Sequence, residues 1–137
     1  MKELKHREVV RWFLIIDFLI GLLFTGIFVF IPDLFLNFIN WSISATDHRA
    51  LFGYRIIGAA IFGLSAASFL ASFKENWEEI NVTMEMECVW LLGAILIMLW
   101  GHFSFSLPLE AWFIDVILIV LFFGFLILYL IEREKKP

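Results

Sequence analysis

The sequence predicts an all-α membrane protein with four transmembrane helices in an antiparallel bundle and a short interfacial helix between the first two. Hydrophobic residues make up 62% of the 137 residues and mean hydropathy is +0.92, whereas soluble proteins contain roughly 45–50% apolar residues. Four stretches reach the length of about 20 apolar residues that a span needs. The loops between them are short, so we expect a single domain over residues 1–137.

The first predicted helix covers residues 12–31. A charged segment precedes it, as in a secretory signal peptide, but the apolar run has membrane length, contains Asp17 and is followed by no small-residue cleavage site. Pro32 ends the run, because proline has no backbone N–H with which to continue a helix. We therefore expect a retained transmembrane helix.

A short amphipathic helix is expected at residues 33–43, between the first two spans. Its sequence, DLFLNFINWSI, mixes apolar side chains with Asp33, Asn37 and Asn40. A helix of this kind lies in the membrane interface, where Trp41 would join the aromatic belt.

The second predicted helix covers residues 51–73 and carries small residues at every fourth position. These are Ala59, Gly63, Ala67 and Ala71. Residues four apart share one helix face, and small side chains allow helix backbones to approach closely in a bilayer. This row is therefore predicted to be the most buried helix face of the bundle.

The first helix carries a matching stripe with the same spacing. Its members are Asp17, Gly21 and Thr25. We place this stripe against the 51–73 helix, with Gly21 allowing the close contact.

The third helix can be placed in two ways. A span at 80–100 would bury both Glu85 and Glu87, whereas a span at 88–107 leaves them at the surface and buries His102. An acidic side chain at the centre of a span costs roughly 2.5–3.5 kcal/mol. The sequence therefore favours 88–107, after a polar connection.

The fourth predicted helix covers residues 111–131 and follows a tight turn around Pro108. Beyond Asp115 it is apolar on every face. We expect it at the rim of the bundle, in contact with lipid or with another subunit.

The Lys and Arg residues predict the orientation. Eight lie on the side of the two termini, and two lie on the other side; the two are Arg49 and Arg55. Because cytoplasmic loops are enriched in Lys and Arg, we expect a multi-pass protein of the plasma membrane with both termini in the cytoplasm.

Three polar residues fall about one turn inside the same end of their predicted helices. They are Arg55, His102 and Asp115. Opposite charges inside a bundle can satisfy one another, so we predict an Arg55–Asp115 ion pair with His102 as a third neighbour. The cluster would fix the helix register or bind an anion, a lipid headgroup or a quinone carbonyl; alternatively, Arg55 extends alone to the outer headgroups.

Metal and haem sites are not expected. His48 and His102 lie toward the same membrane face, which is the arrangement of bis-histidine haem ligation, but no third ligand accompanies them and His48 lies in a loop. Cys88 is the one cysteine of the chain, which excludes an intrachain disulfide and a multi-cysteine centre.

Asp17 is the remaining ionisable residue within a predicted span. It is a candidate proton site, because acidic residues inside membranes form proton relays. The alternative is a structural role in which it accepts hydrogen bonds from Ser65, Ser68 or water, or reaches the surface beside Arg11.

A proline-terminated first helix, a short interfacial segment and then "RIIGAAIFGL" resemble the small four-helix prokaryotic membrane proteins of the DoxX-like families. The resemblance covers roughly residues 12–73 and rests on Arg55, Gly58, Gly63 and Leu64. It implies a four-helix membrane fold, and some members are linked to quinone or thiosulfate oxidation complexes.

Three functions remain. Since no phosphate-binding loop or nucleophile elbow is present, we expect no enzyme and favour a non-catalytic subunit or assembly factor, bound to other membrane subunits or to its own copies. The second is a redox-associated subunit that binds quinone or haem near Arg55 and His102. The third is a small proton-coupled transporter that uses Asp17, although that residue is predicted nearer the cytoplasmic end than the midplane. No basic patch indicates nucleic acid as a partner.

Overall fold

The computed structural model describes residues 2–38, 48–105 and 109–133, and these residues are almost entirely helical, with no strand among them. The elements are α1 (Lys2–Phe30), α2 (Pro32–Phe38), α3 (His48–Ala71), α4 (Trp77–Phe105), the 3-10 turn η1 (Leu109–Ala111) and α5 (Trp112–Arg133). Four of the helices are long and apolar enough to cross a membrane, as predicted. The stretches concerned are Arg7–Phe30, Leu51–Ala71, Trp77–Ser104 and Leu109–Arg133.

Helix α4 begins eleven residues before its predicted start at residue 88. The backbone amides of Glu79 and Ile80 donate to the carbonyl of Asn76, which closes the first turn. Glu78 and Glu79 then lie at the positive end of the helix dipole, where acidic side chains are favourable. The predicted polar connection is therefore mostly helix.

The long α4 is tolerated because Glu85 and Glu87 both have partners on other helices. Tyr129 of α5 donates to Glu85 over 2.7 Å, and Ser68 of α3 donates to Glu87 over 3.1 Å. The predicted start at residue 88 rested on the cost of placing an acidic side chain inside a span, and that cost applies to glutamates without such partners.

A short helix follows the first span as predicted, but it begins at Pro32 itself, and the predicted range beyond Phe38 lies outside the described residues. The expected belt residue Trp41 lies outside the described residues, as does the turn at Pro108.

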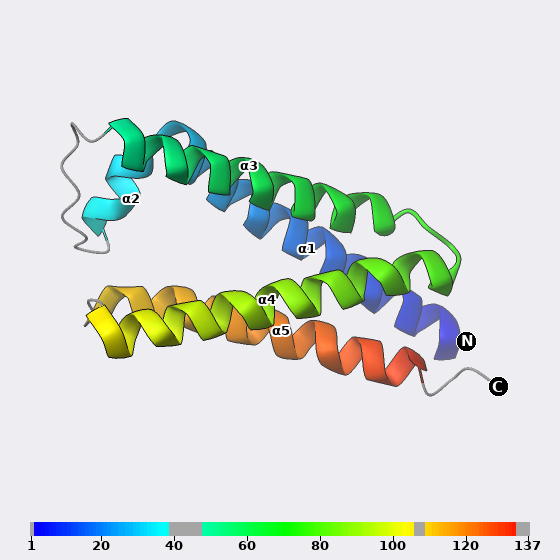
Figure 1. Cartoon of the computed structure of the whole chain (residues 1–137). Helices are drawn as coiled ribbons and strands as arrows, with labels where there is room; N and C mark the ends of the chain where they lie inside the picture. Colours follow the sequence, from blue (N-terminus) through cyan, green and yellow to red (C-terminus); the bar gives the residue numbers. More distant parts are fainter. Residues whose placement is uncertain (1, 39–47, 106–108, 134–137) are drawn as a thin grey trace.

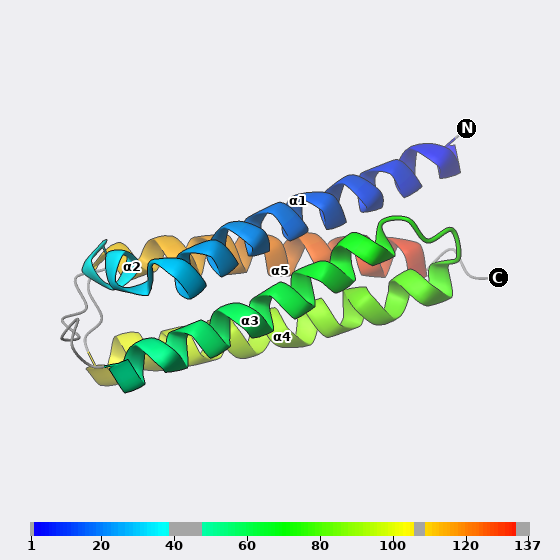
Figure 2. The same ribbon diagram turned by 90° about the horizontal axis from the view of Figure 1, so that it is seen from above.

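The long helices form two pairs, α1 with α3 and α4 with α5 (Figure 1). Figure 2, turned by 90°, shows α1 above α5 and α3 above α4, so the pairs lie across from each other. We call the end where α1 begins and α5 ends the termini end, and the opposite end the α2 end. In Figure 1 the pairs approach each other toward the termini end and diverge toward the α2 end.

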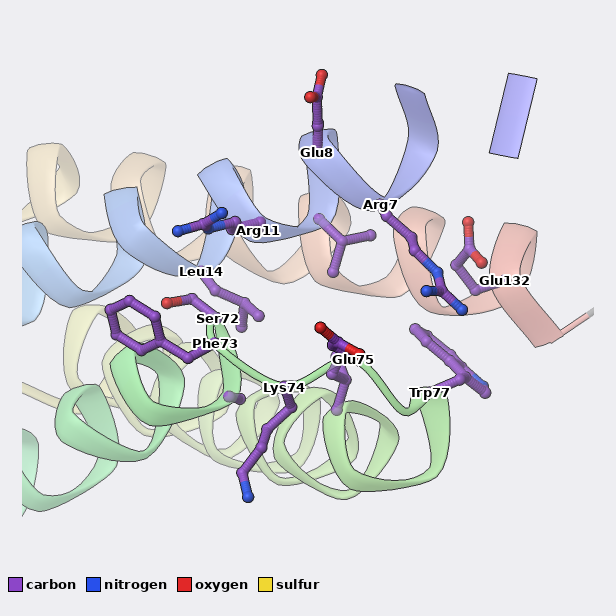
Figure 3. A pocket seen from close by; sticks show the side chains of 13 residues that line it. Arg7, Glu8, Arg11, Leu14, Ser72, Phe73, Lys74, Glu75, Trp77 and Glu132 are labelled. Carbon is purple, nitrogen blue, oxygen red and sulfur yellow. The ribbon is translucent and has the colours of Figure 1, made fainter. Parts of the chain in front are cut away.

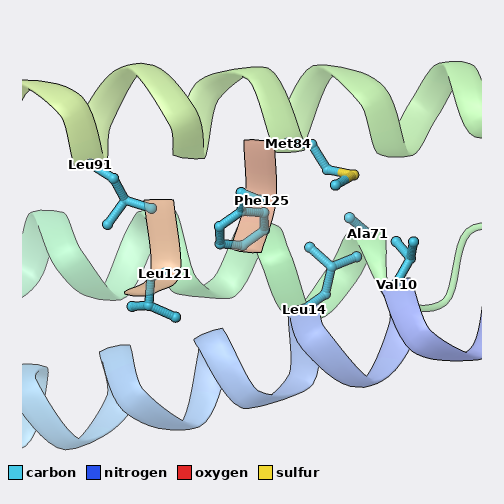
Figure 4. Packing of buried hydrophobic residues seen from close by; sticks show 7 residues of the cluster. All are labelled: Val10, Leu14, Ala71, Met84, Leu91, Leu121 and Phe125. Atoms are coloured by element: carbon cyan, nitrogen blue, oxygen red, sulfur yellow. The ribbon is translucent and has the colours of Figure 1, made fainter. Parts of the chain in front are cut away.

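The apolar core lies in the half of the molecule toward the termini end (Figure 4). It contains Val10, Leu14, Ala71, Met84, Leu91, Leu121 and Phe125, which come from all four long helices. Leu14, Met84 and Phe125 are fully buried. Helix α5, expected at the rim, thus places two side chains in this core as well as exposing a wide apolar surface.

Helices α1 and α3 pack closely at two glycines. A Cβ atom on Gly21 would overlap the Ser65 Oγ, and one on Gly58 would lie 2.9 Å from a methyl carbon of Val29. Thr25 also donates to the Gly58 carbonyl over 3.2 Å. The prediction that Gly21 allows contact between these helices is confirmed.

The predicted small-residue row is wrong as the buried face of α3. Ala59 and Gly63 are exposed, Ala67 is half-buried and Ala71 alone is buried. The buried positions of α3 are instead Gly58, Ser65, Ser68 and Ala71, and Ser72 directly after the helix is also buried. Serine is also small, and Ser65 and Ser72 donate to backbone carbonyls of α3, so burial leaves their hydroxyl protons bonded.

Candidate functional site

Two carboxyl groups from different helices meet around one serine hydroxyl. Asp17 of α1 and Glu87 of α4 are 7% and 3% exposed, and Ser68 of α3 is fully buried between them. The Ser68 Oγ donates to Glu87 Oε1 over 3.1 Å, and the Asp17 carboxyl group lies beside the same serine. We call Asp17, Ser68 and Glu87 the carboxyl cluster.

The helix periodicity places these residues together. Asp17 lies one turn before Gly21, on the face that contacts α3, and Ser68 is one of the buried positions of α3. On α4, Glu87 belongs to the buried stripe of Met84, Leu91 and Ile95, with helical spacing of three and four residues.

The carboxyl cluster has too few protons to bond both acids in their ionised forms. A serine hydroxyl has one proton, so it donates to one carboxylate at a time. A hydrogen bond to the second carboxyl group then requires that group to carry a proton of its own. The geometry therefore suits the binding of a proton.

An apolar cavity of about 310 Å³ extends from the carboxyl cluster between the helix pairs. Its walls come from α1, α3, α4 and α5, and its polar side chains are Asp17, Ser65 and Glu87. No lysine, arginine or histidine is among its described lining residues. We call it the inter-pair cavity.

A second, polar cavity of about 540 Å³ lies at the termini end (Figure 3). The figure shows Arg7 near Trp77 and Glu132, and Arg11 lies with its guanidinium carbon 5.7 Å from the ring centre of Phe73. We call it the termini-end cavity.

The apolar core separates this cavity from the carboxyl cluster. Leu14 and Ala71 belong both to the core and to the cavity wall, and Leu14 precedes Asp17 by one helical turn. A side chain from α1 and one from α3 thus border the polar cavity on the side of the core.

The predicted cluster of Arg55, His102 and Asp115 forms only in part. The Nε2 atom of His102 lies 2.6 Å from Asp115 Oδ2, and these side chains are 4% and 1% exposed. Trp112 stacks on the His102 ring with centroids 4.0 Å apart. We call this the histidine–aspartate pair.

The predicted Arg55–Asp115 ion pair is wrong. Arg55 is exposed, and within the described part of the chain it forms no ion pair. Helix α3 packs mainly on α1, whereas α5 packs mainly on α4, so the nearest polar residue to Asp115 comes from α4. Asp115 Oδ1 is buried and has no hydrogen-bond partner in the described residues.

The geometry gives little support for haem or metal ligation. The side chain of His48 lies outside the described part, and Nε2 of His102 is hydrogen-bonded to Asp115. Among described residues, no group of three His, Cys, Asp or Glu could hold a metal ion.

Comparison with known proteins adds no further constraint. No protein-family model, no curated protein and no solved structure matches the chain. The resemblance to DoxX-like proteins stays a prediction, and the function must be argued from the geometry alone.

Sequence reasoning missed Glu87 as a site residue. The cost of burying it was weighed without a partner, although Asp17 and Ser68 were already paired as candidates. The available signal was the spacing of Met84, Glu87 and Leu91, which places the acid on an apolar helix face.

Proposed function

We propose that this chain is a proton-coupled transporter of the plasma membrane, and that Asp17 and Glu87 together bind the coupling proton. In this proposal the four long helices cross the bilayer as an antiparallel bundle, α2 lies in the outer interface and both termini are cytoplasmic. The charge distribution of the sequence supports this orientation.

One observation carries the proposal: two buried acids on different helices lie at a single buried serine, which donates its hydroxyl proton to Glu87. Ionisable side chains inside a membrane domain are costly and commonly mark proton or ion pathways. Asp17 lies five residues beyond Trp12, where the apolar run begins, which is about 7 Å of helix. The acid is therefore inside the apolar part of the proposed span.

The two cavities support transport rather than a purely structural role. The inter-pair cavity reaches the acids from the α2 half of the bundle, and the apolar core blocks them from the termini-end cavity. A carrier needs a central site that is reached from one side at a time. This arrangement corresponds to a state closed toward the cytoplasm.

The other sequence-based functions have less support. The prediction of a non-catalytic subunit or assembly factor stays untested, and the wide apolar surface is equally suited to lipid. A quinone or haem site near Arg55 and His102 would require His102 to leave Asp115 and Trp112, since its ring is already covered by them.

The proposal can be tested with purified protein in liposomes that carry an imposed pH gradient. Uptake would be measured for ethidium as a permanent organic cation, toluenesulfonate as a permanent organic anion and sorbitol as a neutral solute. We expect the gradient to drive at least one of them in the wild type and none in the Asp17→Asn/Glu87→Gln double variant. Asp33→Asn on the exposed face of α2 is the matched control.

Infrared spectroscopy provides the second measurement. The wild type should show a protonated carboxylic acid band that disappears in the double variant and persists in Asp33→Asn. Equal fluxes in the wild type and the double variant for all three probes, with an unchanged carboxyl band, would refute the proposal.

A further inference from the structure

We propose that the inter-pair cavity binds a lipophilic organic cation, which takes the place of a proton on Asp17 and Glu87. The inference rests on the proposed function and names its substrate class. It follows from the charge of the cavity, from its walls and from its connection to a second apolar space.

The charge of the cavity selects a cation. Asp17 and Glu87 are the ionisable side chains among its described lining residues, and both lie at one end of it. An anion there would meet two carboxyl groups and no basic side chain. A cation would instead neutralise a carboxylate that otherwise must hold a proton.

The walls select a lipophilic molecule with a flat or aromatic body. Beyond the acids and Ser65, the lining is aliphatic or aromatic, and Phe24, Phe28 and Trp90 contribute rings. Rings of this kind attract cations through their faces. Phe28 is held by Tyr54 and Phe35, with ring centres 6.0 Å and 4.8 Å away. The Phe28 ring is therefore held in position before a ligand binds.

A larger apolar cavity of about 740 Å³ adjoins this site. The two cavities share wall residues, namely Ile20, Phe24, Ile114 and Ile117. The larger cavity lies between α1, α2 and α5, and Asn37 is the one polar residue among its described lining. A lipophilic solute could thus pass between apolar surroundings and the acids, whereas a strongly hydrated ion would lose its water there.

The exchange conserves charge. A protonated carboxyl group releases its proton as the organic cation arrives, and the carboxylate that remains pairs with the cation without forming a covalent bond. Binding should therefore release about one proton for each cation bound. No oxidant, nucleotide or metal ion is required.

The test uses two probes of the same shape and opposite charge, tetraphenylphosphonium and tetraphenylborate. Isothermal titration of the purified protein in lipid nanodiscs, repeated in two buffers with different ionisation enthalpies, gives the affinity and the number of protons released. We expect the phosphonium to bind with release of about one proton. Tetraphenylborate should show only the partition seen with empty nanodiscs.

The variants separate charge from hydrophobicity. Asp17→Asn and Glu87→Gln should each weaken phosphonium binding at least tenfold and reduce proton release, while Asp33→Asn should leave both unchanged. Trp90→Leu should weaken binding a few-fold without changing proton release. Size-exclusion profiles and melting temperatures would show that each variant is folded.

Two results would overturn the inference. One is binding of tetraphenylborate as tight as that of the phosphonium, and the other is unchanged phosphonium affinity in the double variant. If the pH gradient drives toluenesulfonate or sorbitol in the liposome experiment while no cation binds, the substrate class is wrong and the proposed function stands.

Discussion

The carboxyl cluster and the histidine–aspartate pair both bury acids inside the bundle, but they differ in how the acids are satisfied. Asp115 faces an imidazole nitrogen at 2.6 Å, and Trp112 covers the ring. Asp17 and Glu87 face each other around a single hydroxyl and border a cavity. Along α4, Glu87 and His102 are fifteen residues apart, which corresponds to about 22 Å of helix.

The difference indicates which buried acid is structural. A group with a dedicated partner loses stability when that partner is removed, because it is then buried unsatisfied. When two buried acids face each other, neutralising one of them removes the repulsion between their negative charges. Replacing one residue of the histidine–aspartate pair should therefore destabilise the protein, whereas neutralising Asp17 or Glu87 should change its stability little.

The largest effect is expected for His102→Leu. It leaves Asp115 buried without its imidazole partner, and removing one member of a buried pair costs about 3–5 kcal/mol. Replacing both residues by leucine should recover most of this loss. Unfolding in a denaturing detergent, followed by circular dichroism, measures both. A loss as large for Glu87→Gln would break the comparison.

The next effect concerns the α1–α3 contact that positions Asp17. Gly21→Ala places a methyl group against Ser65, and overpacking of this kind costs about 1–3 kcal/mol. The matched control is Gly63→Ala, since a Cβ atom there has no neighbour within 4 Å. The control should be neutral or more stable, because alanine favours helix by about 1 kcal/mol over glycine. Equal melting temperatures for the two variants would contradict the observed packing.

A smaller effect is expected for Ser68→Ala. It removes the hydrogen bond to Glu87, and bonds to charged groups contribute about 1.5–3 kcal/mol. Protonation of the acids compensates for part of this, so we expect a loss near the lower limit. Ser72→Ala is the matched control, because the Ser72 hydroxyl donates only to the nearby backbone carbonyl of Phe69. A loss as large for Ser72→Ala as for Ser68→Ala would show that the shared hydroxyl has no special role.

The smallest effect is expected for Arg55→Gln. Arg55 is exposed, and substitutions at such surface positions change stability by about 0.5 kcal/mol or less. The ion pair expected from the sequence would instead make this variant as unstable as His102→Leu. Thermal unfolding of the two variants side by side decides between these outcomes.

Apolar run length was enough to predict four long helices, and the Gly21 contact followed from residues four apart. The partner of Asp115 could not be predicted in this way, because similar depth in two helices does not determine which of their faces meet. The same limit applies to the small-residue row, because its spacing does not determine whether that face of α3 or the face with Gly58, Ser65 and Ser68 is buried. Glu87 was missed because its burial depends on Ser68 and Asp17, which belong to other helices.

The close packing at Gly21 and Gly58 makes α1 and α3 a rigid unit, because neither helix can slide along the other without a clash between backbone and side chain. Any rearrangement that exposes Asp17 toward the termini end must then move α1 and α3 together, as a rigid body, relative to α4 and α5. Leu14, Met84 and Phe125 meet across that seam. Contacts between apolar side chains are non-directional, so this part of the interface can open and close at low cost, and the Ser68–Glu87 hydrogen bond is the polar contact described here that would have to break.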